Sequence, residues 1–298
     1  EIFRVGAAEY EENGALIPEE GFASFEKTHV LLKSPITTPL GTGFRSLNVT
    51  LRKKYDLYAN MRPAKSNAAV KTPFEHVDIV MFRENTEDLY AGVEEKIDEN
   101  TAHSIKIITR KCSERIVRSA FDYAVKNKRK KVTCVHKANI MKLSDGLFRD
   151  VFYEISREYP GIEAEDKIVD NVAMQLVMHP ETFDVIVTEN LYGDILSDLT
   201  SGLIGGLGLL PSSNMGTDFA MFEAVHGSAP DIAGKGIANP TAFLWSACMM
   251  LEHLGKQEIS AKIRRAVDEV LKDGTILTPD LGGCAGTEAY TKAIIERL

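Results

Sequence analysis

Short apolar runs of strand length alternate with helical patterns along this chain, and this alternation constrains the fold more than any other feature. Strands are predicted at residues 29–32, 77–82, 105–109, 132–135 and 184–188, with a further strand-like run at 2–5. Helices are predicted at residues 113–127, 144–158, 172–178, 194–204, 241–254, 258–272 and 287–297. Alternation of the two elements is typical of α/β proteins with a largely parallel sheet.

The composition is that of an ordinary globular protein, with 44% hydrophobic and 26% charged residues, and 298 residues suffice for two lobes. The formal net charge of −8 argues against nucleic acid as a partner, because phosphate binding needs a basic face. We recognise neither a signal-peptide pattern nor a run of transmembrane length, so no membrane partner is expected. The cysteines form no C-x-x-C pair, which predicts free thiols in a reducing, cytoplasmic compartment; they are Cys112, Cys134, Cys248 and Cys284.

The window from residue 34 to residue 63 concentrates arginines, hydroxyl side chains and an asparagine. Its members are Thr37, Thr38, Arg45, Ser46, Asn48, Arg52 and Arg62. Arginine forks and hydroxyls bind carboxylates, and a helix that begins at Ser46 or Asn48 would offer its first N–H groups to an anion. The window therefore predicts either a pocket for a small molecule with several carboxylates or a capped surface helix with solvated arginines.

Two aspartates follow the predicted strand at 184–188. Asp194 and Asp198 are four residues apart, so a helix would place both on one face, at the sheet edge where α/β proteins bind ligands. Asp170, at the end of the strand-like run 168–170, is a third candidate. Oxygen-only ligands suggest Mg²⁺ or Mn²⁺, and the alternative is a solvated acidic helix face.

Proton-transfer candidates also follow predicted strands. Arg83 and Tyr90 lie in FRENTEDLYAG, and Lys137 and Asn139 lie in VHKANIMK. Burial can lower the pKa of such a lysine, and a tyrosine can protonate an enolate-like carbon. Each residue alone could simply make a structural hydrogen bond, but together with the arginines and aspartates they describe metal-assisted chemistry on a polycarboxylate.

Glycine-rich loops suggest a nucleotide site outside the Rossmann pattern. GTGFRS at 41–46 lacks the third glycine of the dinucleotide fingerprint. The loop at 223–240 is rich in glycine and proline, is flanked by His226 and Asn239, and places Asp231 where a carboxylate could bridge ribose hydroxyls. We read it as a cofactor loop, with a purely structural loop as the alternative.

Five segments together resemble one known family. RSLNVTLRKKYDLYANMRP, FRENTEDLYAG, HKANIMK, NLYGDILSD and HGSAPDIAGKGIANP are similar, in this order, to the signature segments of the β-decarboxylating dehydrogenases. Among these the chain resembles the NAD-dependent isocitrate dehydrogenases of prokaryotic type. The resemblance implies oxidative decarboxylation of isocitrate, with homoisocitrate or 3-isopropylmalate as alternative substrates and a non-catalytic regulatory subunit as a further alternative.

The resemblance also implies the role of each site residue. The isocitrate carboxylates would be bound by Ser46, Asn48, Arg52, Arg62 and Arg83. The catalytic acid/base pair would be Tyr90 and Lys137. The metal ligands would be Asp170, Asp194 and Asp198. The cofactor would be contacted by Thr38, Asn139, His226, Gly227, Ala229, Asp231, Ile232 and Asn239.

The fold that the resemblance implies has two domains and is not a Rossmann fold. A large cofactor-binding domain would comprise residues 1–57 and 205–298, and a small domain residues 58–204. The stretch at 90–110 would be a dimer arm, with an ordinary hairpin as the alternative. We expect a homodimer with shared active sites, in which Lys137 and Asp170 serve the neighbouring subunit.

Two further expectations follow from comparison with the family pattern. NADP enzymes of the family place Lys-Tyr where this chain has Asp231-Ile232, and they add a tyrosine and an arginine where it has Pro279 and Gly283, so NAD is the expected cofactor. The family's opening strand and GDGIGPE-like loop have no counterpart in this sequence, so we expect that an N-terminal β-α unit is missing.

Overall fold

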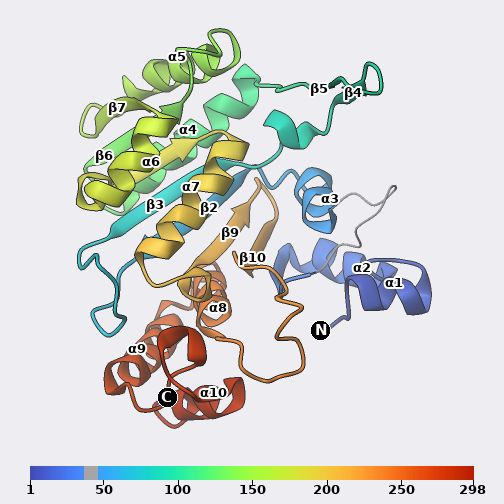
Figure 1. Cartoon of the computed structure of the whole chain (residues 1–298), viewed down its shortest axis with the longest axis vertical. Helices are drawn as coiled ribbons and strands as arrows, with labels where there is room; N and C mark the ends of the chain where they lie inside the picture. The colour runs from blue at the N-terminus through green and yellow to red at the C-terminus, as the bar shows by residue number, and fades with distance from the viewer. Residues whose placement is uncertain (37–45) are drawn as a thin grey trace.

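The computed structural model describes residues 1–36 and 46–298, and a single eight-stranded sheet runs through it (Figure 1). The strand order is β1-β10-β9-β2-β3-β8-β6-β7. Its strands are β1 (Val30–Lys33), β2 (Ala59–Lys65), β3 (Asp78–Glu84), β6 (Lys131–His136), β7 (Glu163–Ile168), β8 (Val185–Thr188), β9 (Pro211–Met215) and β10 (Ala220–Ala224). Four of the seven neighbouring pairs are parallel and the three around β9 and β2 are antiparallel, so the sheet is mixed.

Ten α-helices surround the sheet in the described residues. They are α1 (Ala7–Asn13), α2 (Glu19–Thr28), α3 (Leu47–Lys54), α4 (Arg110–Lys126), α5 (Ser144–Ser156), α6 (Val169–Met178), α7 (Asn190–Leu203), α8 (Thr241–His253), α9 (Gln257–Asp273) and α10 (Thr287–Ile295). The seven predicted helices correspond to α4 through α10, with shifted ends, and the α/β class is confirmed. No helix of the described residues has the length and apolar character needed to span a membrane.

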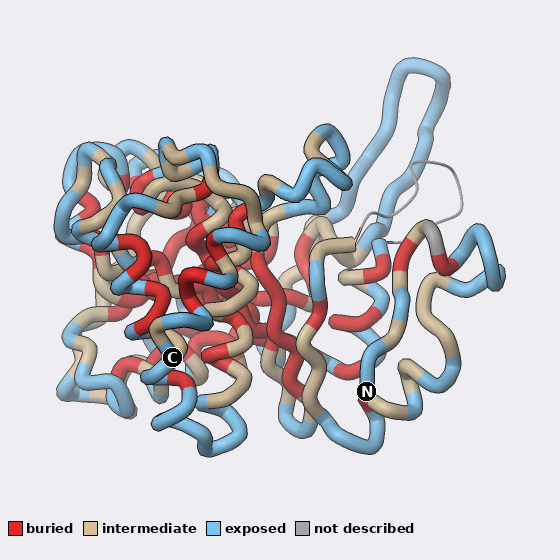
Figure 2. Tube along the Cα trace, turned by 90° about the horizontal axis from the view of Figure 1, so that it is seen from below, coloured by how far each residue is buried: buried red, intermediate tan, exposed pale blue. Residues whose placement is uncertain are grey.

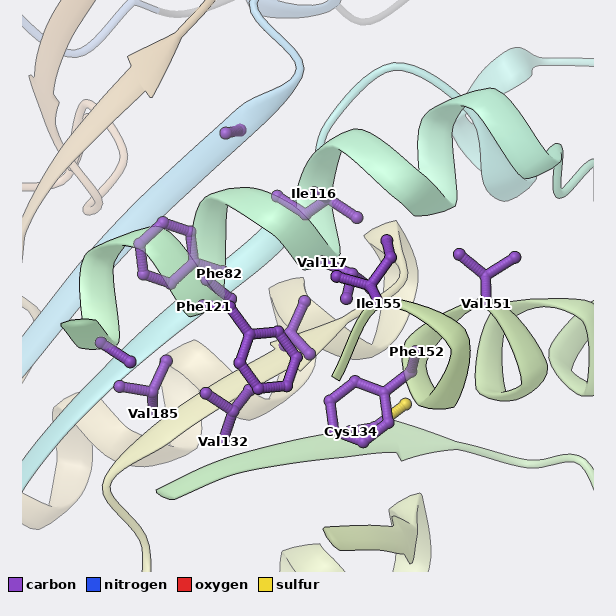
Figure 3. Close-up of a cluster of buried hydrophobic side chains, with 14 of the residues drawn as sticks. Phe82, Ile116, Val117, Phe121, Val132, Cys134, Val151, Phe152, Ile155 and Val185 are labelled. Carbon is purple, nitrogen blue, oxygen red and sulfur yellow. The ribbon is translucent and has the colours of Figure 1, made fainter. Parts of the chain in front are cut away.

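Two apolar cores cover opposite faces of the parallel half of the sheet. On one face, α4 and α5 pack against β6 and β8 through Phe121, Phe152, Val132 and Val185 (Figure 3). On the other face, α6 and α7 pack against β3 and β8. Alternate residues of β3 divide between the two cores, as the two-residue period of a strand requires. The face under α7 is the one that carries the candidate site.

The stretch at 90–110 forms a hairpin that projects from the body of the molecule. It contains the antiparallel strands β4 (Glu94–Lys96) and β5 (Ala102–Ser104), both exposed throughout (Figure 2). Residues 105–109 are not the predicted strand, because this extended segment bonds locally to the chain before β4 instead of joining the sheet: the Ile105 N–H donates to the Val93 carbonyl at 2.9 Å. Whether the hairpin pairs with another copy stays a prediction.

Several strands differ from the sequence-based expectation. Residues 2–5 form no strand, and Ile2 is fully exposed. Four strands were not predicted: β2, β7, β9 and β10. Strands β2 and β9 bury polar side chains and β7 is rich in charge, so these three do not show the apolar pattern of a strand. Asp170 is not at the end of a strand; it lies in the first turn of α6. In the sheet, the predicted domain boundary falls between β9 and β2, and the division itself stays a prediction.

Candidate active site

Two buried arginines on β2 and β3 form the base of the site. In this antiparallel pair Asn60 lies opposite Arg83 and Arg62 lies opposite Met81, so both arginine side chains leave the face that α7 covers. Arg83 is 1% exposed and Arg62 is 5% exposed. Burial, together with the charge of Arg83, lowers the pKa of Arg62 to about 9, so the guanidinium keeps its charge at neutral pH. Buried cations of this kind need anionic partners.

Arg52 extends from α3 toward the same region. Ser46 is the N-cap residue of α3, as predicted, but it is exposed and its hydroxyl makes no capping hydrogen bond. Arg52 is buried and donates to the Glu223 carboxylate at 3.4 Å. Glu223 also pairs with Lys33 at 2.6 Å. Burial would raise the pKa of Glu223, but Lys33 and Arg52 outweigh it and lower the pKa to about 2.

A polar network joins Arg52 to Arg62. The Asn214 amide donates to Glu223 at 2.9 Å, and the Asn60 amide donates to Asn214 at 2.9 Å. Arg62 Nε in turn donates to the Asn60 carbonyl oxygen at 2.6 Å. The guanidinium groups are therefore fixed before any ligand arrives, which reduces the cost of ordering them on binding.

These groups line a small polar pocket of about 100 Å³. Its walls include Lys33, Asn48, Arg52, Arg62, Glu223 and His226. Two buried polar atoms here, Asn48 Oδ1 and Arg52 Nε, find no hydrogen-bond partner among the residues that the structure describes. Buried polar atoms are normally satisfied, so the two orphaned atoms indicate a place for a polar ligand. A larger cavity of about 970 Å³ lies between β2 and helices α8 and α9, and of the residues predicted for the site it contains none.

Helix α7 brings the aspartate pair to the arginines. The Asp194 carboxylate accepts from Arg83 and from Tyr90, whose hydroxyl is 2.6 Å away. Arg62 Nη1 lies 3.5 Å from Asp194 and 3.9 Å from Asp198. Burial would raise the pKa of Asp194, but Arg83 and the Tyr90 hydroxyl hold it below its usual range. Burial raises the pKa of Asp198, and the charge of Asp194 adds to this effect although Arg62 opposes it.

Tyr90 lies in the short 3-10 helix η1 (Asp88–Ala91) and is half-buried. Its ring centroid is 5.0 Å from the Arg83 guanidinium carbon. Burial raises the pKa of Tyr90, and its hydrogen bond to Asp194 acts in the same direction. The hydroxyl therefore keeps its proton at neutral pH, as a proton donor must.

Asp194 and Asp198 suit a hard divalent cation. Carboxylate oxygens are the donors that Mg²⁺ and Mn²⁺ prefer, and a cation between the two would relieve the repulsion that contributes to the raised pKa of Asp198. Among the described residues, no group of three or more potential metal-ligating side chains comes together within the chain. Asp170 therefore does not complete the pair from the same chain.

Lys137 and Asp170 pair with each other instead. The Lys137 ammonium donates to the Asp170 carboxylate, and the Asp170 side chain is 68% exposed. Neither residue has a hydrogen bond or ion pair to Tyr90, Asp194 or an arginine of the pocket in the part of the chain that the structure describes. The structure thus separates the predicted site residues into two groups, of which the second lies at the surface.

The predicted cofactor residues lie mostly in the loop after β10. His226 and Gly227 border the pocket, whereas Asp231 is exposed. Ala229 has a φ of 45°, a left-handed conformation that is unusual for a residue other than glycine. The Asn239 side chain is already bonded to Asp280 and to the backbone of Thr241 at the start of α8. Asn139 is exposed in the turn after β6, and Thr38, like Thr37 and Arg45, lies outside the described residues.

Lys33 and Glu223 were not among the predicted site residues. They are direct neighbours across the parallel strands β1 and β10, and both are nearly inaccessible to solvent. Lys33 is the one charged residue of the apolar run VLLK and stands at its end, and Glu223 is the one charged residue of the apolar run AMFEA. A charge within such a run indicates a buried ion pair or a site, because an unpaired buried charge is very costly.

Comparison with known proteins agrees with this geometry. A family model described as isocitrate/isopropylmalate dehydrogenase matches residues 1–298. A Drosophila melanogaster protein described as a probable mitochondrial NAD isocitrate dehydrogenase subunit alpha is 50% identical over 282 residues, covering 95% of this chain and 75% of its own. The NADP isocitrate dehydrogenase of Thermus thermophilus is 50% identical over 304 residues, covering 100% of this chain and 61% of its own.

A solved structure supports the fold directly. The crystal structure of isocitrate dehydrogenase from Methylococcus capsulatus superposes with a TM-score of 0.95 at 54% identity, covering 98% of this chain and 88% of that one. The family model, the sequence identity over most of the chain and the shared fold all indicate the same family. This chain belongs to the isocitrate/isopropylmalate dehydrogenase family.

Proposed function

We propose that this protein oxidises and decarboxylates isocitrate to 2-oxoglutarate and CO₂ while reducing NAD. The observation that carries the proposal is the polar pocket lined by Arg52 and Arg62, whose Arg62 guanidinium also reaches the Asp194 and Asp198 carboxylates of α7. Its orphaned atoms on Asn48 and Arg52 support a ligand that both accepts and donates hydrogen bonds, as a hydroxy acid does.

The charges around the pocket and α7 support a tricarboxylate. The cations are Lys33, Arg52, Arg62 and Arg83. The carboxylates are Asp194, Asp198 and Glu223. The chain's own groups therefore leave a surplus of one positive charge, and a divalent cation would raise it to about three. Isocitrate balances this charge, whereas a dicarboxylate such as 3-isopropylmalate leaves part of it uncompensated.

Each group of the chain has a defined task in this reaction. Arg52, Arg62 and Arg83 would hold substrate carboxylates, together with Asn48, which lines the pocket, and the exposed Ser46 at the start of α3. Asp194 and Asp198 would hold Mg²⁺ or Mn²⁺ together with Asp170 of a second copy. When bound, the cation supplies Lewis acidity at the C2 hydroxyl and stabilises negative charge on the oxygen left after decarboxylation.

Proton transfers are assigned to Lys137 and Tyr90. Lys137 of a second copy, in its neutral amine form, would accept the proton of the C2 hydroxyl as the C2 hydride passes to NAD. The C3 carboxylate then leaves as CO₂, and its bonding electrons pass to C3 through the enolate. Tyr90, kept protonated by burial and by Asp194, would give its proton to C3.

NAD is favoured over NADP by two features. The exposed carboxylate of Asp231 would accept a hydrogen bond from a 2′-hydroxyl and repel a 2′-phosphate. A Cβ on Gly283 would stand 2.0 Å from the Leu277 carbonyl oxygen, so this position does not tolerate the larger residue expected of an NADP enzyme.

We also propose that the protein works as a homodimer in a reducing, cytoplasmic compartment. Three apolar side chains near the hairpin, Val93, Ile97 and Ile105, are between 42% and 47% exposed, which supports burial against another copy. All four cysteines are free thiols, which supports a reducing environment.

The decisive experiment follows NADH formation with isocitrate, homoisocitrate and 3-isopropylmalate in the presence of Mn²⁺. We expect isocitrate to give the highest kcat/KM. Preference for another acid would reassign the substrate, and no turnover with any of the three would favour a non-catalytic regulatory subunit. Because Tyr90, Lys137 and the aspartates are all present, we expect turnover.

A further inference from the structure

Lys106 forms a buried ion pair next to Lys137, the lysine assigned to proton transfer. Its ammonium donates to the Asp145 carboxylate at 2.6 Å and to Glu189 at 2.5 Å. The Lys106 side chain is 12% exposed, Asp145 is fully buried and Glu189 is 1% exposed. Burial alone would lower the pKa of Lys106, but the two carboxylates outweigh it and raise the pKa. One cation therefore faces two buried carboxylates, and burial, with the charge of Asp145, raises the pKa of Glu189 well above its usual range although Lys106 opposes this shift.

Asp145 connects this ion pair to the Lys137 backbone. Its Oδ2 accepts the Lys137 N–H at 2.7 Å and the Tyr192 hydroxyl at 3.1 Å. Its Oδ1, in addition to Lys106, accepts the Ser144 hydroxyl at 3.1 Å. Asp145 is thus fully occupied, and the orientation that Lys106 imposes on its carboxylate is passed directly to the peptide at Lys137.

The other side of the same turn is fixed independently. The Ala138 N–H donates to Nδ1 of His136 at 3.0 Å, and Nε2 of His136 bonds to Asp166 at 2.8 Å. The two hydrogen bonds hold consecutive peptide groups of the turn after β6. The Lys137 side chain is then the part left free to reach outward, and it does so toward the exposed Asp170.

Lys106 also belongs to the base of the projecting hairpin. Its neighbours bond across to the chain before the hairpin: Ile105 N–H to Val93, and Asp88 N–H to the Ile107 carbonyl, both at 2.9 Å. The Tyr192 ring covers the ammonium at 4.4 Å. Glu189, its second carboxylate, immediately precedes α7, and its Oε1 has no hydrogen-bond partner among the described residues. The hairpin base, the Lys137 turn and the start of α7 therefore meet at one ammonium group.

We propose that Lys106 is a positioning residue: through Asp145 it fixes the Lys137 backbone, so that the hairpin base sets where the Lys137 ammonium stands. The role in turnover rests on the proposed function, but the placement of Lys137 can be measured without activity. A purely structural ion pair would stabilise the fold without any specific effect at Lys137.

The first test observes the Lys137 amide directly. In the full-length protein labelled with ¹⁵N-lysine, the Lys137 backbone resonance is identified by its loss in Lys137→Arg. Lys106→Met is expected to move this resonance, because the carboxylate that accepts its N–H loses its cation. The matched control is Lys131→Met, which removes a lysine on β6 that pairs with Glu165 at 3.0 Å and is 19% exposed. An unmoved resonance, or equal movement in both variants, overturns the proposal.

The second test separates placement from stability. Lys106→Met should lower kcat on the order of 10- to 100-fold with little change in the KM for isocitrate, since misplacing a reacting group costs rate more than binding. Lys106→Arg should recover most of the lost kcat because it restores the cation. A rise in KM with unchanged kcat would overturn the proposal, as would equal kcat losses in Lys131→Met and Lys106→Met.

A milder variant covers the case in which Lys106→Met does not fold. Tyr192→Phe keeps the ring over Lys106 and removes only the hydroxyl, which donates to Asp145 at 3.1 Å and accepts from Lys106 at 3.5 Å. It should move the Lys137 resonance in the same direction by less. If it leaves the resonance unmoved, the network does not control the turn. If the wild-type protein does not turn over isocitrate, the proposed function fails while the resonance still tests the positioning.

Discussion

Gly193 of α7 lies directly against the side chain of Arg83. A Cβ on residue 193 would stand 2.5 Å from the Arg83 Cγ and 2.7 Å from its Cβ, closer than real Cβ contacts come. Arg83 is on a central strand, so its backbone cannot withdraw. The absence of a side chain at position 193 is what lets Arg83 reach Asn190 and Asp194.

Gly193→Ala should therefore displace the Arg83 guanidinium from the site. We expect the KM for isocitrate to rise about 10-fold or more, the effect of losing one charged hydrogen bond of about 1.5–3 kcal/mol, and the free energy of unfolding to fall by about 1–3 kcal/mol. Steady-state kinetics and urea denaturation measure the two effects. The control is Gly202→Ala on the same helix, where a Cβ meets nothing within 4 Å and neither quantity should worsen.

The lowered pKa of Glu223 predicts that the free energy of unfolding falls as the pH becomes acidic. Its pKa is lowered from 4.5 to about 2 in the folded protein, so its stabilising contribution is complete above the unfolded value and is lost as pH falls toward 2. That contribution is roughly 3 kcal/mol. At neutral pH, Glu223→Gln should be less stable than wild type, because Lys33 and Arg52 lose their anion.

Urea denaturation between about pH 7 and pH 3 tests this dependence. The gap in unfolding free energy between wild type and Glu223→Gln should narrow as pH drops below the unfolded pKa of 4.5. A gap that stays constant over the whole range would contradict the assignment. Glu258→Gln, on the exposed face of α9, is the control and should show no such gap.

Elements with a clear apolar period were predictable from the sequence, whereas the prediction failed for strands that bury polar residues. Helix α9 follows a regular apolar stripe that packs through Val267 and Val270. Strand β2 buries Asn60 and Arg62, and no rule based on hydrophobic alternation finds such a strand. Its polar side chains are tolerated only because the neighbouring strands supply partners, and those partners are remote in sequence.

The candidate site was likewise predictable only in part. Residue type and a place within or after a strand were enough to group Arg62, Arg83 and Asp194, and the structure brings them into contact. The Lys33–Glu223 pair could not be found in this way, because it exists only through the pairing of β1 with β10. How strongly the Glu223 carboxylate attracts the Arg52 guanidinium depends on burial, and a local sequence pattern does not encode burial.

Cofactor choice can be tested at the loop after β10. Replacing Asp231 and Ile232 together by Lys and Tyr should shift the ratio of kcat/KM for NADP over NAD upward on the order of 10- to 100-fold, since a repulsive carboxylate is exchanged for a cation. The control is Asp218→Lys, which makes a similar charge change in the exposed turn between β9 and β10. If both variants change the ratio equally, the loop does not select the cofactor.

Sharing of the active site between subunits makes the sharpest prediction about assembly. Lys137 pairs with Asp170, whereas Tyr90 contacts Asp194 beside the buried Arg83, and no hydrogen bond or ion pair joins the two pairs in the described residues, so the two assigned acid/base groups of one site should come from different chains. Lys137→Met and Tyr90→Phe homodimers should each be nearly inactive. A mixed dimer purified through two different tags should recover about half of the wild-type kcat, because one of its two sites then has both groups intact. If each site instead drew both groups from one chain, every site of the mixed dimer would carry one defect and no activity would return.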